Sequence, residues 1–264
     1  MGSAALFARQ FDKSAKRVKE RLEEYMGEPE NDEKVHDVRT ALRRLEATFM
    51  LMPKKLRRRN RKQIDAHKQF FRSNSRVRDY DIIRGRIAAR AQGDLFVQLA
   101  ADLDRKRKSE VAGAVRMARR VSAMPAASLK GLKDGDLESR MDEVAGRLLG
   151  KVKKELPVVT ADRKNVEELH RLRKDLKKLR YVLEAMPARQ RKPHEKKASK
   201  ILNGKKPAEE RFKELQDMLG QIHDIDITVQ YLSSLGKKEA IPVMQGEKAE
   251  RDRLFDKFAK SVRS

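Results

Sequence analysis

Cysteine and tryptophan are absent from this chain of 264 residues. Without cysteine there can be no disulfide, no thiolate zinc site and no cysteine nucleophile. No stretch reaches the roughly 20 uncharged apolar residues that a membrane-spanning helix needs. The apolar core of a secretory signal is also missing, because Arg9, Asp12 and Lys13 fall where it would lie. We therefore expect a cytoplasmic protein without a membrane partner.

Aromatic residues are scarce, with nine Phe and four Tyr in the whole chain. Proteins that read single-stranded nucleic acid usually stack bases on aromatic side chains. The sequence also lacks a glycine-rich phosphate loop, a nucleophile elbow and an HExxH motif. The composition favours recognition of phosphate charge over recognition of bases, and it indicates no metal and no cofactor.

Positive charge is abundant: 64 Lys and Arg stand against 40 Asp and Glu, a net charge of +24. Such an excess indicates a polyanionic partner, such as nucleic acid, an acidic membrane face or a phosphate polymer. Apolar residues make up 39% of the chain, which is too many for a disordered basic tail. The protein is therefore expected to bury a core and to present a basic surface.

The sequence predicts helices almost throughout, because Ala, Leu, Arg, Lys and Glu dominate and no window alternates with period 2. Prolines interrupt the chain at intervals, and eight amphipathic stretches are predicted as helices: 4–26, 32–52, 56–91, 94–123, 136–155, 163–186, 208–235 and 239–263. The segment 125–135 contains Pro125, Gly131 and Gly135 and is predicted to link an N-terminal half, 1–124, to a C-terminal half, 136–264.

The two halves repeat each other. Residues 35–45 align with 169–179 at an offset of 134, and residues 77–81 align with 222–226 at an offset of 145. The difference, 145 − 134 = 11 residues, fits an insertion in the lysine-rich stretch 189–207. We predict an all-α fold of two pseudo-twofold-related helical bundles of about four helices each, with a basic groove between or along them.

Apolar residues in the repeat recur at steps of three and four, which is typical of a packed helix face. We call these positions the seam: Val35, Val38, Leu42, Leu45, Phe49 and Met52 in the first copy, and Leu169, Leu172, Leu176, Leu179, Leu183 and Met186 in the second. A stripe of basic residues lies one position, about 100°, around from the seam on both helices.

The stripe and the matching downstream positions supply the predicted anion-binding residues. They are His36, Arg39, Arg43, Arg44, Lys68 and Arg78 in the first half, and His170, Arg173, Lys177, Lys178, Arg180, Lys213 and His223 in the second. A charge run on a helix is commonly a solvated face with i,i+4 pairs. Recurrence of the same residue types beside the same seam favours a binding role.

Aspartates follow the second repeat element in both halves: Asp79 and Asp81, then Asp224 and Asp226. Either they cap helices and pair on the surface, or Asp79 and Asp224 orient the basic side chains of the site. The pair His223-Asp224 also resembles a metal ligand pair, but Arg78 occupies the matching position and does not bind metal. His67 and His194 have no repeat partners, and His67 is predicted to be an ordinary helix-face residue.

Dense basic runs follow each seam helix. They comprise Lys54, Lys55, Arg57, Arg58, Arg59, Arg61 and Lys62 after Pro53, and Arg189, Arg191, Lys192, Lys196, Lys197, Lys200, Lys205 and Lys206 after Pro187. Their equivalent positions predict that they extend the basic surface of each half.

These motifs resemble the CHAD family, the conserved-histidine α-helical domain. The resemblance rests on His36-x-x-Arg39-x-x-x-Arg43-Arg44, on His170-x-x-Arg173-x-x-x-Lys177-Lys178-x-Arg180, and on the later Arg78-Asp79 and His223-Asp224. It implies a stand-alone, noncatalytic domain of two pseudo-symmetric bundles that binds inorganic polyphosphate in a central basic groove. Ser75 departs from the pattern, because the second copy has Gly220 there.

Three functions stay open at this point. The first is noncatalytic polyphosphate binding, with an expected association with polyphosphate granules in the cytoplasm. The second is binding of structured RNA through its backbone. The third, which the sequence supports least, is a metal-dependent phosphohydrolase.

Overall fold

The computed structural model describes residues 1–90, 93–204 and 206–263. Three positions named in the sequence predictions lie outside these residues: position 91 of a predicted helix, Lys205 of a basic run and Ser264 of the C-terminal half. The first half contains α1 (Ser3–Gly27), α2 (Asp32–Leu51), α3 (Lys54–Arg59), α4 (Arg61–Arg90) and α5 (Asp94–Ser122). The second contains α6 (Asp134–Ala161), α7 (Val166–Glu184), α8 (Ala188–Ile201), α9 (Ala208–Ser234), the 3₁₀ turn Lys238–Ala240 and α10 (Ile241–Arg263). These described segments contain no strand, and the predicted all-α fold is confirmed.

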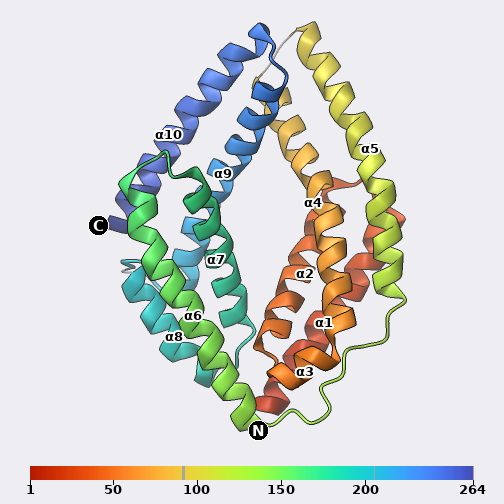
Figure 1. The fold of residues 1–264 in the computed structure, drawn as a ribbon, viewed down its shortest axis with the longest axis vertical. Helices are drawn as coiled ribbons and strands as arrows, with labels where there is room; N and C mark the ends of the chain where they lie inside the picture. Colours follow the sequence, from red (N-terminus) through yellow and green to blue (C-terminus); the bar gives the residue numbers. More distant parts are fainter. Residues whose placement is uncertain (91–92, 205, 264) are drawn as a thin grey trace.

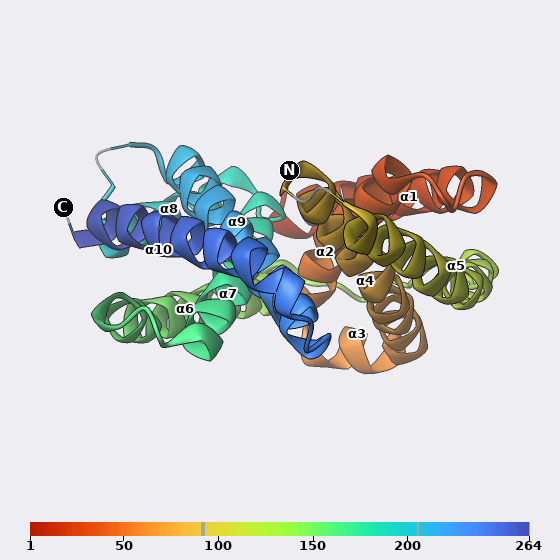
Figure 2. The ribbon, with the colours of Figure 1, turned by 90° about the horizontal axis from the view of Figure 1, so that it is seen from above.

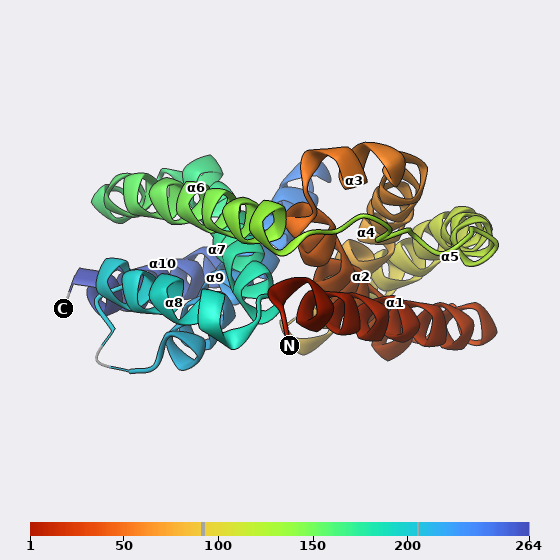
Figure 3. The same ribbon diagram turned by 90° about the horizontal axis from the view of Figure 1, so that it is seen from below.

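The helices form two lobes, with α1–α5 on the right of Figure 1 and α6–α10 on the left. Across the middle, α2 packs against α7 and α4 packs against α9. The views from above and below show the same division (Figures 2 and 3). The two helices of each repeat therefore face their counterparts at the interface between the lobes.

Apolar burial along the seam fixes α2 and α7 in the core. Every seam residue is buried, from Val35 at the start of α2 to Met186 just beyond the end of α7. The side chains belong to one apolar cluster that includes residues of both halves. The predicted seam is confirmed.

At the start of α2, the side chain of Asn31 caps the helix. It accepts hydrogen bonds from the amides of Glu33 and Lys34, at 3.0 and 3.4 Å.

A second, smaller apolar cluster joins the lobes at the upper end of the molecule in Figure 1. Ile83, Ile87, Leu99 and Leu103 come from α4 and α5, and Leu232 and Ala240 come from the other lobe. With the seam in the middle, this cluster fixes the distance between α4 and α9.

Within the described residues, each half has one α-helix more than the four that the sequence predicts. The six-residue α3 follows α2, and the 14-residue α8 follows α7. The extra residues of the second half lie within the predicted stretch 189–207. They make α8 longer than α3 and form the longer connection from α8 to α9.

Two prolines predicted to separate helices lie inside them instead. Pro157 is within α6 and Pro193 within α8. Leu156 and Val159, on either side of Pro157, are buried against the core. Their burial outweighs the lost backbone hydrogen bond, and the carbonyl left without a donor belongs to Lys153, an exposed residue.

The connection between the halves runs from the end of α5 to the start of α6 across the lower face of the molecule (Figure 3). Asn60, which is 1% exposed, separates α3 from α4. Its amide donates to the carbonyls of Leu56, at 3.0 Å, and Ser128, at 2.9 Å, and its oxygen accepts from the Ser128 amide at 2.8 Å. Asn60 therefore anchors the connection to the first half. No helix in the described ranges is long and apolar enough to cross a bilayer.

Substitution of Leu176 by Asp should unfold or strongly destabilise the protein, because the side chain is 0% exposed in the seam. We expect a loss of about 3–5 kcal/mol in the free energy of unfolding, measured by urea denaturation followed by circular dichroism. Lys174→Asp, on the exposed face of the same helix, is the control and should unfold close to wild type. Equal unfolding midpoints for the two variants would contradict the seam assignment.

Candidate functional site

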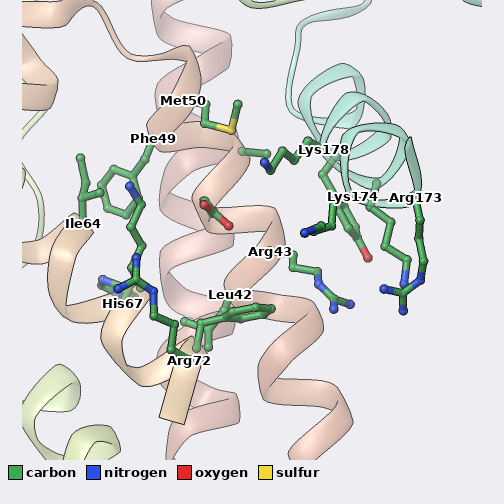
Figure 4. Close-up of a pocket in the computed structure, with 16 residues that line it drawn as sticks. Leu42, Arg43, Phe49, Met50, Ile64, His67, Arg72, Arg173, Lys174 and Lys178 are labelled. Atoms are coloured by element: carbon green, nitrogen blue, oxygen red, sulfur yellow. The ribbon is translucent and has the colours of Figure 1, made fainter. Parts of the chain in front are cut away.

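A cavity of about 670 Å³ opens between α2, the first part of α4, and α7. We call it the central cavity. Five of the predicted anion-binding residues line it: Arg43, Lys68, Arg173, Lys177 and Lys178. Figure 4 shows Arg43 and Arg72 on one side of the cavity and Arg173, Lys174 and Lys178 of α7 on the other. Helix packing at the seam thus brings the basic stripes of both halves to one place.

Arg39 lies below the surface, at 8% exposure. Its guanidinium donates to the backbone oxygen of Phe71 and to the Ser75 hydroxyl, both at 3.1 Å, and it lies 4.3 Å from the centre of the Phe71 ring. Burial, aided by the neighbouring guanidinium of Arg43, lowers the pKa of Arg39 to about 9. Arg39 therefore braces α2 against α4 and also carries positive charge into the interior. Ser75, the departure from the repeat, is one of its acceptors.

Arg173 and Lys177 approach the same point from α7. Burial lowers the pKa of Arg173 to about 10 and that of Lys177 to about 7. The charges of Arg173 and Arg43 depress the pKa of Lys177 further. In the described part of the chain, the Nε of Arg173 is buried without a hydrogen-bond acceptor. Both cations are thus poorly compensated in the free protein.

Two carboxylates lie among these cations, Asp79 on α4 and Asp224 on α9. Burial raises the pKa of each, and positive charges around them act in the opposite direction. Both lie inside long helices, so neither is a helix cap. Neither forms a hydrogen bond or ion pair within the described residues, and they act on Arg39 and Arg173 through charge alone. We call the whole group the central cluster: Arg39, Arg43, Arg78, Arg173, Lys177, Asp79 and Asp224.

Asp226, two residues farther along α9, orients a predicted site residue. Its Oδ2 lies 2.9 Å from Nε2 of His170, and its Oδ1 accepts from Nε of Arg251 at 2.6 Å. A carboxylate can only accept, so His170 carries a proton on Nε2. His223 lies edge-on to His170, with ring centroids 4.8 Å apart. Burial and the charge of Arg173 lower the pKa of His223 to about 3, so this ring is neutral near pH 7.

The first half contains an equivalent aspartate–arginine ion pair, but no histidine bonds to its aspartate. Asp81 accepts from Nε of Arg107 at 2.5 Å, and Arg107 also donates to the backbone oxygen of Glu30 at 2.8 Å. In the second half, Arg251 donates in the same way to the backbone oxygen of Arg163, at 3.1 Å. His36 lies at an exposed position and has no hydrogen bond or ion pair among the described residues. Desolvation and the charge of Arg78 lower its pKa.

Arg44, Arg180 and Lys178 are engaged in ion pairs, and of these three only Lys178 lines the central cavity. Arg44 lies 3.7 Å from Glu184, an ion pair between α2 and α7. Arg180 donates to the same carboxylate at 2.7 Å and to Gln216 at 3.1 Å. Lys178 lies 3.6 Å from the buried Asp175. Lys213 is exposed on α9 and does not line the central cavity.

Sequence reasoning missed several residues that line the central cavity: Glu46, His67, Arg72, Lys174 and Tyr181. His67 was predicted to be an ordinary helix-face residue, yet it faces the cavity, and burial lowers its pKa. No sequence signal marked it, because its place at the cavity depends on how α4 lies relative to α7. Arg107 and Arg251 were also missed, although they repeat at an offset of 144, close to the 145 of their aspartate partners.

No group of three or more His, Cys, Asp or Glu side chains in the described ranges is arranged to hold a metal ion. His223 and Asp224, the pair that resembles metal ligands, differ in their surroundings. His223 contacts His170, whereas Asp224 is surrounded by Arg173, Lys177 and Arg78.

Comparisons with known proteins agree with this fold. The crystal structure of the CHAD domain from the plant Ricinus communis matches with a TM-score of 0.63 and 14% identity, over 100% of this chain and 92% of its own. No curated protein matches the chain. The family model of the CHAD domain matches residues 5–233. Since this match covers most of the sequence, including both copies of the histidine and arginine motif, the chain belongs to the CHAD domain family.

Proposed function

We propose that the protein binds inorganic polyphosphate in the central cavity and does not hydrolyse it. The observation that carries this proposal is the excess of desolvated positive charge in the central cluster. Five cations stand there against two carboxylates, and the pKa values of Arg39, Arg173 and Lys177 are lowered to about 9, 10 and 7. The negative charge of a bound polyanion would favour the charged forms of these side chains and so oppose the lowering of their pKa values.

The donors of the cavity suit phosphate oxygens. Arginine offers a planar fork of N–H groups to such oxygens, and lysine adds a compact charge. The unsatisfied Nε of Arg173 and the ammonium of Lys177 come from one side, and Arg43 comes from the other. A linear phosphate chain between them would contact both halves of the protein at once.

The environment of Phe71, one of the aromatic residues that line the cavity, favours this ligand over RNA. The ring of Phe71 lies 4.3 Å from the guanidinium of Arg39 and 5.3 Å from that of Arg43. A ring that already stacks on two guanidinium groups does not offer a free face to a base. Polyphosphate has no bases, so the charged side chains of the cavity are sufficient to bind it.

The hydrogen bonds of the second half count against a metal-dependent hydrolase. Asp226 uses one carboxylate oxygen for Arg251 and the other for His170. A metal ion at this carboxylate would have to compete with both partners. Asp224 is next to Arg173 and Lys177, whose charges would repel a divalent cation. These contacts support binding without metal-assisted chemistry.

Replacement of Arg173 and Lys177 by Gln should weaken binding of long-chain polyphosphate by at least about tenfold at fixed ionic strength, because two charge-assisted contacts are lost. The control is Lys153→Gln with Lys154→Gln, which removes the same charge from the exposed face of α6. Titration calorimetry gives the affinities, and circular dichroism shows that each variant is folded. Equal losses in the two double variants would mean that the net charge, and not the cavity, attracts the ligand.

Binding should also depend on pH through Lys177, whose pKa in the free protein is about 7. A bound phosphate favours the charged amine and raises this pKa. Affinity is therefore highest below pH 7, where Lys177 is already protonated, and falls as the pH rises above 7 toward the pKa of the bound state. The measurement compares wild type with Lys177→Met from about pH 6 to pH 9, with long chains that have few titrating ends. An equal pH dependence in both proteins would show that Lys177 does not face the ligand.

A further inference from the structure

A second basic cavity, of about 770 Å³, lies between α3 and the N-terminal part of α6. These two elements lie side by side at the lower end of the molecule in Figures 1 and 3. Its lining includes the cations Lys54, Lys55, Arg57, Arg140 and Arg147 and the carboxylates Asp136 and Glu143. The positive charge therefore exceeds the negative charge, as it does in the central cluster.

The carboxylates leave most of these cations without partners. Glu143 accepts from Arg140 at 2.7 Å, so it is engaged. Within the described residues, Lys54, Lys55 and Arg147 form no hydrogen bond or ion pair, and the Nε of Arg57 is buried without an acceptor. Burial, followed by the charges of Arg140 and Arg147, lowers the pKa of Arg57.

The remaining lining points to the class of ligand. Apart from Pro53, the cavity wall consists of charged residues and the small or polar Gly135 and Ser139. Among the described residues that line it there is no aromatic side chain on which a base could stack, and Pro53 is the only apolar residue that a lipid chain could contact. A compact anion with several oxygens, such as a short run of phosphate groups, meets the donors that this lining offers.

The two cavities are separated by the last turn of α2. Met50 lines the central cavity, and its backbone oxygen accepts a hydrogen bond from Nε of Arg140, a residue of the second cavity, at 3.2 Å. The donors of the second cavity come from α3 and α6, which contribute nothing to the lining of the central one. The second cavity can therefore be occupied independently.

We infer that the cavity between α3 and α6 is a second anion-binding site that takes inorganic oligophosphate, with Arg57 as its central donor. This inference does not depend on the proposed function of the central cavity. The basic run after Pro53 then has a specific role in its first part, in addition to its contribution to the surface charge.

The test uses the full chain, labelled with ¹⁵N, and inorganic tripolyphosphate as the probe. The Nε–Hε signal of Arg57, assigned by its loss in Arg57→Gln, should shift and saturate during the titration, because an unsatisfied donor gains an acceptor. The same shift should occur in the Arg173→Gln, Lys177→Gln double variant, in which the central cavity is impaired. An Arg57 signal that does not move with tripolyphosphate would overturn the inference, whatever the double variant does to polyphosphate binding.

A matched pair of variants checks the specificity of the site. Arg57 and the exposed Arg58 are neighbours on α3, but only Arg57 lines the cavity. In the background of the double variant, Arg57→Gln should lower the affinity for tripolyphosphate about tenfold, and Arg58→Gln by less than about twofold. Equal losses would reduce the site to general surface charge and would contradict the inference.

Discussion

Burial of like charges at the α2–α7 interface is the constraint on which the site depends. Helix α2 packs against α7, and the residues beside the seam bring Arg39 and Arg43 close to Arg173 and Lys177. Such an arrangement is unfavourable in the free protein, because each cation is desolvated near others of the same sign. Apolar burial along the seam and at the upper end of the lobes opposes this repulsion. The fold thereby holds a charge excess that an anion can neutralise.

The two halves resemble each other more closely in the ion pairs that form their structural frame than in the surroundings of their site residues. The ion pairs of Asp81 with Arg107 and of Asp226 with Arg251 occupy equivalent places and tie the later helices of each half to the loop before the seam helix. Within this frame the halves differ, because His170 is held by Asp226, whereas His36 is exposed. The resulting surface is pseudo-symmetric in charge but asymmetric in its hydrogen bonds.

Local sequence patterns were sufficient to predict the seam, the basic stripe and the all-α fold, since these follow from helical periodicity. They failed at Pro157, where burial of Leu156 and Val159 keeps the helix intact, and at α8, where a lysine-rich stretch concealed a helix. The cavity residues His67 and Arg72 could not be predicted, because their position depends on how α4 meets α7 in space. Arg57 illustrates the same limit, since only the approach of α6 shows that it differs from its neighbours in the run.

Direct titration of Lys177 by NMR tests the central claim. In the free protein Lys177 should have a pKa near 7, lowered first by burial and then by Arg173 and Arg43. Saturation with long-chain polyphosphate should raise this pKa, since the bound phosphates supply the missing negative charge. A value close to the ordinary lysine pKa of about 10.4 in the free protein, or a low value that polyphosphate leaves unchanged, would contradict the account.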